Sequence, residues 1–154
     1  MLHLTPAPLH RLALRLAHAL RKVWWRVAKP RLAGVNVRVL DGQRHVLLVR
    51  HSYGSRSWTL PGGGLKRGEP PLAAARRELA EELGCTVEEL IPLGVNERRL
   101  HGAPCVTHVY AATLDALPRP DGREVSEARF FSQDDLPSGR AAMVDAALAL
   151  LDGE

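Results

Sequence analysis

The sequence has few cysteines, few aromatic residues and no long apolar run. Cys85 and Cys105 are the only cysteines among 154 residues and form no Cys-x-x-Cys pair, which argues against a disulfide scaffold and a cysteine-based zinc site. Arginines interrupt every leucine-rich stretch near the N-terminus, so none reaches the ~20 apolar residues that a membrane-spanning helix needs. With 45% hydrophobic and 25% charged residues, the composition is typical of a globular domain. We therefore expect a folded, cytoplasmic protein.

Acidic residues are absent from the first 40 positions. Eight of the 21 Lys and Arg residues lie there, which leaves 13 basic residues against all 17 acidic residues in the rest of the chain. The net charge of +4 thus conceals a mildly acidic domain that follows a strongly basic segment. We predict that residues 1–33 form a basic amphipathic helical segment and that residues 34–154 form the main domain.

Residues 9–29 have the composition of a helix, and prolines at positions 6, 8 and 30 bracket them. At 100° per residue the helix has two opposite faces. The basic face holds Arg11, Arg15, His18, Lys22, Arg26 and Lys29, and the apolar face holds Leu12, Leu16, Leu20, Val23, Trp24 and Val27. Such a helix most often packs its apolar face on its own domain or on a second subunit. Contact with an anionic membrane surface, and contact with nucleic acid or another partner, remain open alternatives.

The remaining chain alternates strand and helix patterns. Residues 34–40 and 45–50 read as two strands joined at Asp41-Gly42, and further strands are predicted near 90–99, 104–114 and 124–131. Helices are predicted over about 70–83, where prolines open the segment and Gly84 ends it, and over about 139–151. Strands before, between and after helices predict an α/β (α+β) domain with a mixed sheet.

Three glutamates on the predicted helix of residues 70–83 carry the most informative chemistry. Glu78, Glu81 and Glu82 have the spacing i, i+3 and i+4, which places three carboxylates on one helical face. Like charges at this spacing repel, and a hard divalent cation such as Mg²⁺ or Mn²⁺ would relieve the repulsion and recruit substrate phosphates. The alternative is a solvated face whose glutamates pair with Arg76 and Arg77.

The spacing around these glutamates favours the metal interpretation. A pattern of fixed residues runs from Gly63 through Glu69, Arg77-Glu78-Leu79 and Glu81-Glu82 to Gly84 and Cys85. It resembles the Nudix box, GX5EX7REUXEEXGU, where U is aliphatic; Cys85 is the one departure, and cysteine behaves as a small hydrophobe. The flanking segments WTLPGGG and EVSEARFF also resemble those of Nudix hydrolases, and the resemblance covers roughly residues 34–151.

The resemblance implies a fold and a set of site residues. Nudix proteins are α/β/α sandwiches with a mixed sheet, in which the box forms a loop, helix and loop that hold divalent metal. Glu78, Glu81, Glu82 and the carbonyl of Gly62 would be metal ligands, and Glu78 or Glu81 would orient or deprotonate the attacking water. Glu124 or Glu127 would supply a further ligand or the general base. The structural positions of the box would be Gly63, Glu69, Arg77 and Gly84.

The implied activity is Mg²⁺- or Mn²⁺-dependent hydrolysis of the diphosphate linkage in a nucleoside diphosphate linked to a group X. Tyr53 is a candidate for stacking on a base, and Arg56 and Arg98 are candidates for binding phosphates. One alternative is a Nudix-fold module that senses a nucleotide without cleaving it. Another is a membrane-surface hydrolase of a lipid-linked pyrophosphate, recruited by the basic helix. Because Nudix proteins are often dimers, a homodimer is also expected.

Overall fold

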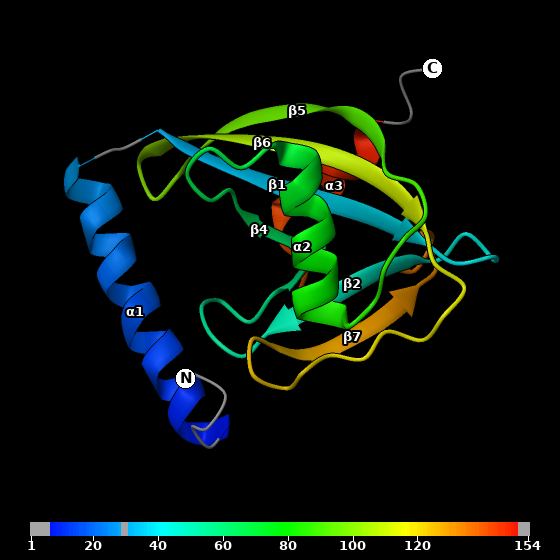
Figure 1. Cartoon of the computed structure of the whole chain (residues 1–154), viewed down its shortest axis with the longest axis horizontal. Helices are drawn as coiled ribbons and strands as arrows, with labels where there is room; N and C mark the ends of the chain where they lie inside the picture. Colours follow the sequence, from blue (N-terminus) through cyan, green and yellow to red (C-terminus); the bar gives the residue numbers. More distant parts are fainter. Residues whose placement is uncertain (1–6, 29–30, 151–154) are drawn as a thin grey trace.

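Seven β-strands form one mixed sheet in the computed structural model, which describes residues 7–28 and 31–150 (Figure 1). In chain order the elements are α1 (Ala7–Ala28), β1 (Leu32–Leu40), β2 (Val46–His51), β3 (Trp58–Thr59), β4 (Gly62–Gly64), α2 (Pro71–Leu83), β5 (Ile91–Leu100), β6 (Ala103–Thr113), β7 (Val125–Phe131) and α3 (Ala142–Ala149). No helix among the described residues is long and apolar enough to span a bilayer.

The central strand β1 changes its neighbour along its length. The main path through the sheet is β3-β2-β1-β6-β5; β7 pairs with β2, and β4 pairs with β1. β1 runs parallel to β6 throughout, whereas every other pair is antiparallel. On its other side β1 pairs first with β4, from Gly34 to Asn36, and then with β2 at Leu40. This switch places the glycine-rich β4 beside the middle of the sheet.

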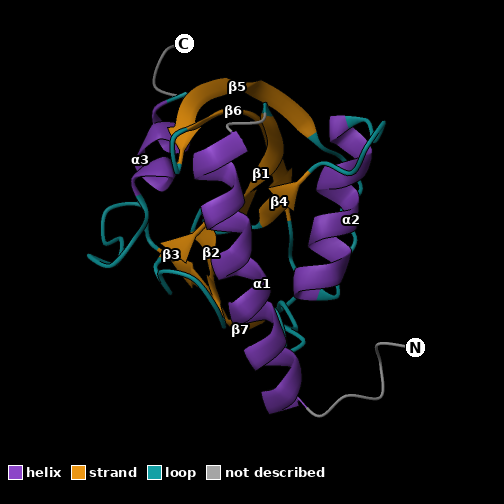
Figure 2. Ribbon diagram, turned by 90° about the vertical axis from the view of Figure 1, so that its left-hand side faces the viewer, coloured by secondary structure: helices purple, strands orange, loops and turns teal. Residues whose placement is uncertain are grey.

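Alternating apolar side chains fill both faces of the sheet. Val35, Val37 and Val39 of β1 point to one face and pack in a core with Leu79 and Leu83 of α2. On the other face a second core joins β2, β3, β6 and α3. Figure 2 shows α2 and α3 on opposite sides of the sheet. The predicted α/β/α sandwich with a mixed sheet is confirmed.

The element boundaries follow local chemistry. α2 begins at Pro71 and ends where Gly84 adopts a left-handed conformation (φ 60°), as predicted. The final helix is shorter than predicted, because residues 139–141 pair with β3 instead: Trp58 N–H donates to the Gly139 carbonyl, and Ala141 N–H donates to the Trp58 carbonyl. Residue 151, at the predicted end of that helix, lies outside the described residues, as do Pro6, Lys29 and Pro30 around α1.

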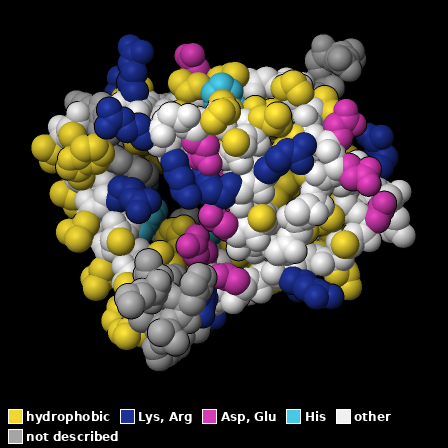
Figure 3. Space-filling view, in the orientation of Figure 1, with side chains coloured by type: hydrophobic (Ala, Val, Ile, Leu, Met, Phe, Trp, Pro, Cys, Tyr) yellow, Lys and Arg dark blue, Asp and Glu magenta, His cyan; other side chains and the backbone are white. Residues whose placement is uncertain are grey.

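The N-terminal helix lies with its basic face toward the domain. Arg11 donates to the Gly122 carbonyl, Arg15 donates to the Ser52 carbonyl, and the His18 ring lies against Tyr53. The large apolar residues of the opposite face, from Leu9 to Val27, are 52–79% exposed. Figure 3 shows hydrophobic side chains gathered along the outer, left-hand edge of the molecule, where α1 lies. Of the expected alternatives, packing of the apolar face of α1 on its own domain is therefore wrong, and packing on a second subunit or contact with a membrane, nucleic acid or another partner stays a prediction.

Candidate active site

The two glycines that open β4 allow the box helix to approach the sheet closely. Gly62 has a φ of +148°, and a Cβ atom there would lie 2.0 Å from the Val35 carbonyl oxygen. A Cβ atom on Gly63 would lie 2.5 Å from Oε1 of Glu78. Only glycine fits at either position without a rearrangement, so the sequence Gly62-Gly63 places backbone directly against the carboxylates of α2.

Glu82 is the most buried of the box glutamates. It is 2% exposed, and both carboxylate oxygens have partners. The Gly62 N–H donates to Oε2 at 3.0 Å, and Nε2 of His51 donates to Oε1 at 2.7 Å. A buried carboxylate is stable only with such partners, so these contacts fix the orientation of Glu82 between β4 and the end of β2.

Strand alternation directs His51 toward Glu82. Leu47 and Val49 of β2 lie in the core on the α2 side, and Leu48 lies in the core on the α3 side. Arg50 accordingly lies over the Trp58 ring on the α3 side, whereas the next residue contacts α2. Burial lowers the pKa of His51, but the hydrogen bond to Glu82 and the charges of Glu82, Glu124 and Glu78 outweigh it, so the pKa is raised. Sequence reasoning missed this residue, because the strand pattern gives the face on which His51 lies but not that Glu82 lies opposite it.

Glu78 lies next to Glu82 on the same side of the sheet. It is 8% exposed, and Arg77 donates to its Oε1 at 2.7 Å. Burial raises the pKa of Glu78; the guanidinium of Arg77 opposes this shift, and the charge of Glu82 adds to it. The structure thus holds two buried carboxylates side by side, with Arg77 bonded to Glu78 and His51 bonded to Glu82.

Arg77 ties the box together. Its Nε and Nη2 donate to the two carboxylate oxygens of Glu69 at 2.8 and 2.9 Å, and Nη2 also donates to the Gly64 carbonyl. Glu69 in turn accepts from the Lys66 N–H at 2.8 Å. The Arg77 hydrogen bonds lower the pKa of Glu69 to about 2. These contacts hold the loop between β4 and α2 against the helix, as the box pattern predicts for Glu69 and Arg77.

Glu81 faces outward. Its side chain is half exposed and accepts from Arg77 at 3.1 Å. Among residues 7–28 and 31–150, no three His, Cys, Asp or Glu side chains are arranged to hold a metal ion. Glu78 and Glu81 both accept from Nη1 of Arg77, whereas Glu82 accepts from His51, so each box carboxylate has a basic partner. Their oxygen chemistry nevertheless fits a hard cation such as Mg²⁺, which typically binds one or two carboxylates and keeps several waters.

The loop after β2 and the segment before β7 complete the rim. The Tyr53 ring lies 5.4 Å from His51 and 5.3 Å from His18 of α1. Burial and the charges of Glu124 and Glu82 raise the pKa of Tyr53 to about 12. The Glu124 carbonyl accepts from Ser52 N–H, which ties the two segments together. Glu127, the alternative acid, instead pairs with Arg50 at 3.1 Å.

The two arginines predicted to bind phosphates lie apart from this cluster. Arg56 is exposed at the end of the loop, in a left-handed conformation (φ 55°). Arg98 on β5 borders a cavity of about 120 Å³ on the α3 side of the sheet, together with Asn36, Thr107 and Met143. Asn36 connects this cavity to the box, because it is the register partner of Gly62.

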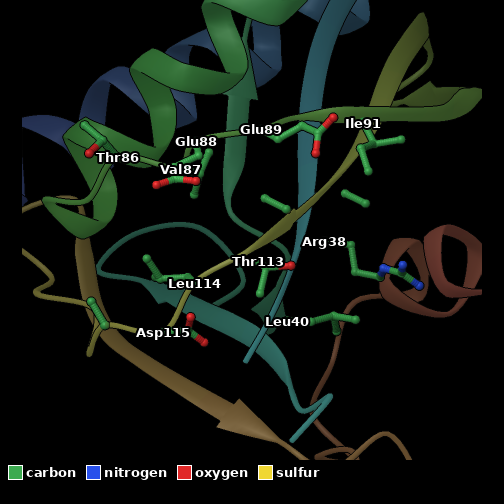
Figure 4. Close-up of a pocket in the computed structure, with 13 residues that line it drawn as sticks. Arg38, Leu40, Thr86, Val87, Glu88, Glu89, Ile91, Thr113, Leu114 and Asp115 are labelled. Carbon is green, nitrogen blue, oxygen red and sulfur yellow. The ribbon is translucent and has the colours of Figure 1, made fainter. Parts of the chain in front are cut away.

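A larger cavity lies elsewhere. It has a volume of about 630 Å³ and is formed by the segment after α2 and by the C-terminal ends of β1 and β6. Figure 4 shows Glu88, Glu89 and Asp115 around it. None of the predicted site residues is among those that line it, so the cavity is separate from the candidate active site.

Comparison with known proteins agrees with the box geometry. The family model for the NUDIX domain matches residues 30–150. An RNA pyrophosphohydrolase of Bartonella bacilliformis is 41% identical over 70 residues, which are 40% of this chain and 41% of that protein. The chain thus matches about two fifths of the length of such curated relatives.

Solved structures share the fold across most of the chain. The MutT NUDIX hydrolase from Burkholderia pseudomallei has a TM-score of 0.72 and 26% identity, with 79% of this chain and 98% of that chain covered. The NUDIX domain of Shewanella oneidensis NrtR, solved with ADP ribose, has a TM-score of 0.69 and 20% identity, over 80% of this chain and 87% of that chain. At that identity the second likeness concerns the fold alone.

Proposed function

The chain belongs to the NUDIX domain family, and we propose that it hydrolyses a pyrophosphate linkage in a nucleotide-type substrate with the help of a divalent metal ion. One observation carries this proposal: two buried carboxylates, Glu78 and Glu82, lie against the Gly62-Gly63 backbone of the box. Burying two acids side by side costs stability, and an acid pair in a purely structural role would bring no compensating benefit.

We propose Mg²⁺, or Mn²⁺ in its place, as the metal. Glu78, Glu81, Glu82 and the carbonyl of Gly62 would hold it, after Glu81 turns from its exposed position. When bound, the ion would neutralise phosphate oxygens and lower the pKa of a water molecule.

The surrounding residues have separate proposed roles. His51 holds Glu82 in place through its 2.7 Å hydrogen bond. Glu78 or Glu81 orients the attacking water, and Glu124 is the further candidate for the general base, because its charge acts on both His51 and Tyr53.

Three residues predicted from the sequence are proposed to bind the substrate. The ring of Tyr53 would stack on a base, and Arg56 and Arg98 would bind phosphates. We propose a nucleoside diphosphate linked to X as the substrate class. A 5′-triphosphorylated RNA end is the second candidate, since curated relatives are named RNA pyrophosphohydrolases. A cytoplasmic location is part of the same proposal.

A substrate panel tests the proposal. The purified chain is incubated with Mg²⁺ and nucleoside triphosphates, nucleotide sugars, dinucleoside polyphosphates or 5′-triphosphorylated RNA, and phosphate is measured after a coupling phosphatase. Glu82→Gln should abolish turnover with little change in melting temperature, because the amide keeps the shape and still accepts from Gly62. Glu89→Gln, an exposed acid outside the site, is the matched control and should stay active. Equal activity of the two variants would refute the assignment.

Two other functions remain as alternatives. A nucleotide-sensing module is favoured by one observation, the ADP ribose held by the NUDIX domain of NrtR. Calorimetric binding of ADP ribose without turnover of any substrate in the panel would support it. A hydrolase of lipid-linked pyrophosphate would act on a diphosphorylated polyprenol in detergent and on no soluble compound.

A further inference from the structure

The exposed face of α1 carries a continuous apolar seam. Its apolar residues recur with alternating spacings of four and three, which correspond to the a and d positions through which two helices pair, so they form one stripe along the helix. The seam consists of Leu9, Ala13, Leu16, Leu20, Val23 and Val27. An amphipathic helix that covers its own domain turns its apolar stripe inward. In this chain the stripe faces outward, and Arg11 and Arg15 on the other side bond to the domain.

We propose that this seam is a dimerisation surface, on which α1 of a second copy of the chain packs in the antiparallel direction. The seam is symmetric about its centre. When a second α1 runs in the opposite direction, Leu9 lies opposite Val27, Ala13 opposite Val23 and Leu16 opposite Leu20. Each heptad position a of one helix then meets a heptad position d of the other. A two-fold axis through the middle of α1 therefore generates a self-complementary interface, as a closed dimer requires.

The residues that flank the seam favour a protein partner of the same kind. Leu12, Ala17, Ala19 and Trp24 lie beside it and carry no charge, and the alanines allow two backbones to approach closely. An interfacial membrane helix instead places Lys and Arg beside its apolar stripe, where they meet lipid headgroups. In α1 the side chains of Arg11 and Arg15 are bonded to carbonyl oxygens of the domain. The charge pattern thus fits a second α1 better than an anionic bilayer.

The exposed area is sufficient for association. Seven large apolar side chains on α1 are each at least half exposed. Together these side chains offer about 500 Å² of apolar surface per copy, which is in the upper part of the range for the largest apolar patch on a monomer. Two copies would bury about 1,000 Å², the lower bound for a specific interface. The proposal names the surface for the homodimer expected of this family and does not depend on the substrate.

Solution mass provides the first test. Sedimentation velocity of the full chain, over a hundredfold range of concentration up to about 100 µM, should give a dimer. Leu16→Asp with Leu20→Asp should give a folded monomer whose melting temperature matches that of wild type diluted to its monomeric range, because both side chains are exposed in the single chain. Leu117→Asp changes an equally exposed leucine off the helix and should remain dimeric.

Three outcomes would overturn the proposal. If the wild type is a monomer at every concentration tested, the seam does not bind a second copy of the chain. A dimer that survives the double substitution would place the interface elsewhere. The wild type could be a monomer that sediments with vesicles of phosphatidylcholine and phosphatidylglycerol, while the double variant does not. That result would show that the seam binds a membrane surface.

Cross-linking tests the direction of the helices. In a Cys85→Ser background, Leu9→Cys chains mixed with Val27→Cys chains should form a mixed disulfide-linked dimer on mild oxidation. Each variant alone should cross-link at least tenfold less, because residue 9 lies far from its own copy in an antiparallel pair. Self-linkage of Leu9→Cys would indicate parallel helices, and absence of any cross-link would refute the seam.

Discussion

Substitution of Gly63 by alanine tests whether the close contact between β4 and α2 sets the position of Glu78. The new Cβ would lie 2.5 Å from Oε1 and 2.6 Å from the carboxyl carbon, whereas ordinary contacts begin near 3.4 Å. The carboxylate must therefore move by about 1 Å, and a displacement of that size at a reacting centre costs about 10²-fold in rate. The backbone of Gly63 is not left-handed, so alanine itself adds no backbone strain.

The assay is kcat/KM on the best substrate of the panel, together with the melting temperature. Gly64→Ala is the matched control in the same strand, since its Cβ would find only the Ala33 carbonyl at 3.9 Å. We expect Gly63→Ala to lose about two orders of magnitude in kcat/KM and Gly64→Ala to stay near wild type, with similar melting temperatures. Full activity of Gly63→Ala would show that Glu78 tolerates displacement and would refute its proposed role.

Two further predictions concern the ion pairs of the box. The pKa of Glu69 falls from 4.5 to about 2 on folding, so its ionised form stabilises the protein above pH 4.5 and this contribution is lost as the pH falls toward 2. Glu69→Gln should therefore be less stable than wild type at pH 6, and its stability should fall less as the pH is lowered. Denaturant unfolding of both proteins between pH 6 and pH 2 measures this. Identical curves of unfolding free energy against pH would contradict the argument. Arg77→Lys keeps the charge but cannot bond Glu69, Glu78 and the Gly64 carbonyl together, so we expect a loss of roughly 1–3 kcal/mol in unfolding free energy and a lower kcat. If Arg77→Lys is as stable as wild type, the several hydrogen bonds of the planar guanidinium group do not contribute to stability.

The parts of the fold that follow from local sequence were predictable. The prolines before α2 and Gly84 after it predicted the helix to within one residue, because both act on the backbone directly. The alternation of Val35, Val37 and Val39 predicted a strand with one buried face. The resemblance to the box implied that Glu69 and Arg77 are structural positions, and the structure pairs them across one short loop and one helix.

The parts that depend on distant pairing were not predictable. The role of His51 depends on the packing of α2 beside the end of β2, which brings together two residues that lie 31 positions apart in sequence. The three glutamates share a helical face as predicted, yet burial distinguishes them: Glu82 is buried and bonds His51 of β2, and the half-exposed Glu81 bonds Arg77 of its own helix. Periodicity gives the face of a side chain and its neighbours on the same helix, but not a partner such as His51 from another element.

The orientation of α1 illustrates the same limit. An amphipathic helix turns its apolar face inward only where an apolar surface is available. Here α2 and α3 already cover the two faces of the sheet, so the sandwich leaves no open core for a third helix. The remaining surface beside α1 presents carbonyl oxygens of Ser52 and Gly122 close to the carboxylates of the site, which bind the basic face instead. The apolar face is thereby directed away from the domain, and its symmetric seam is what a second copy of the chain can bury.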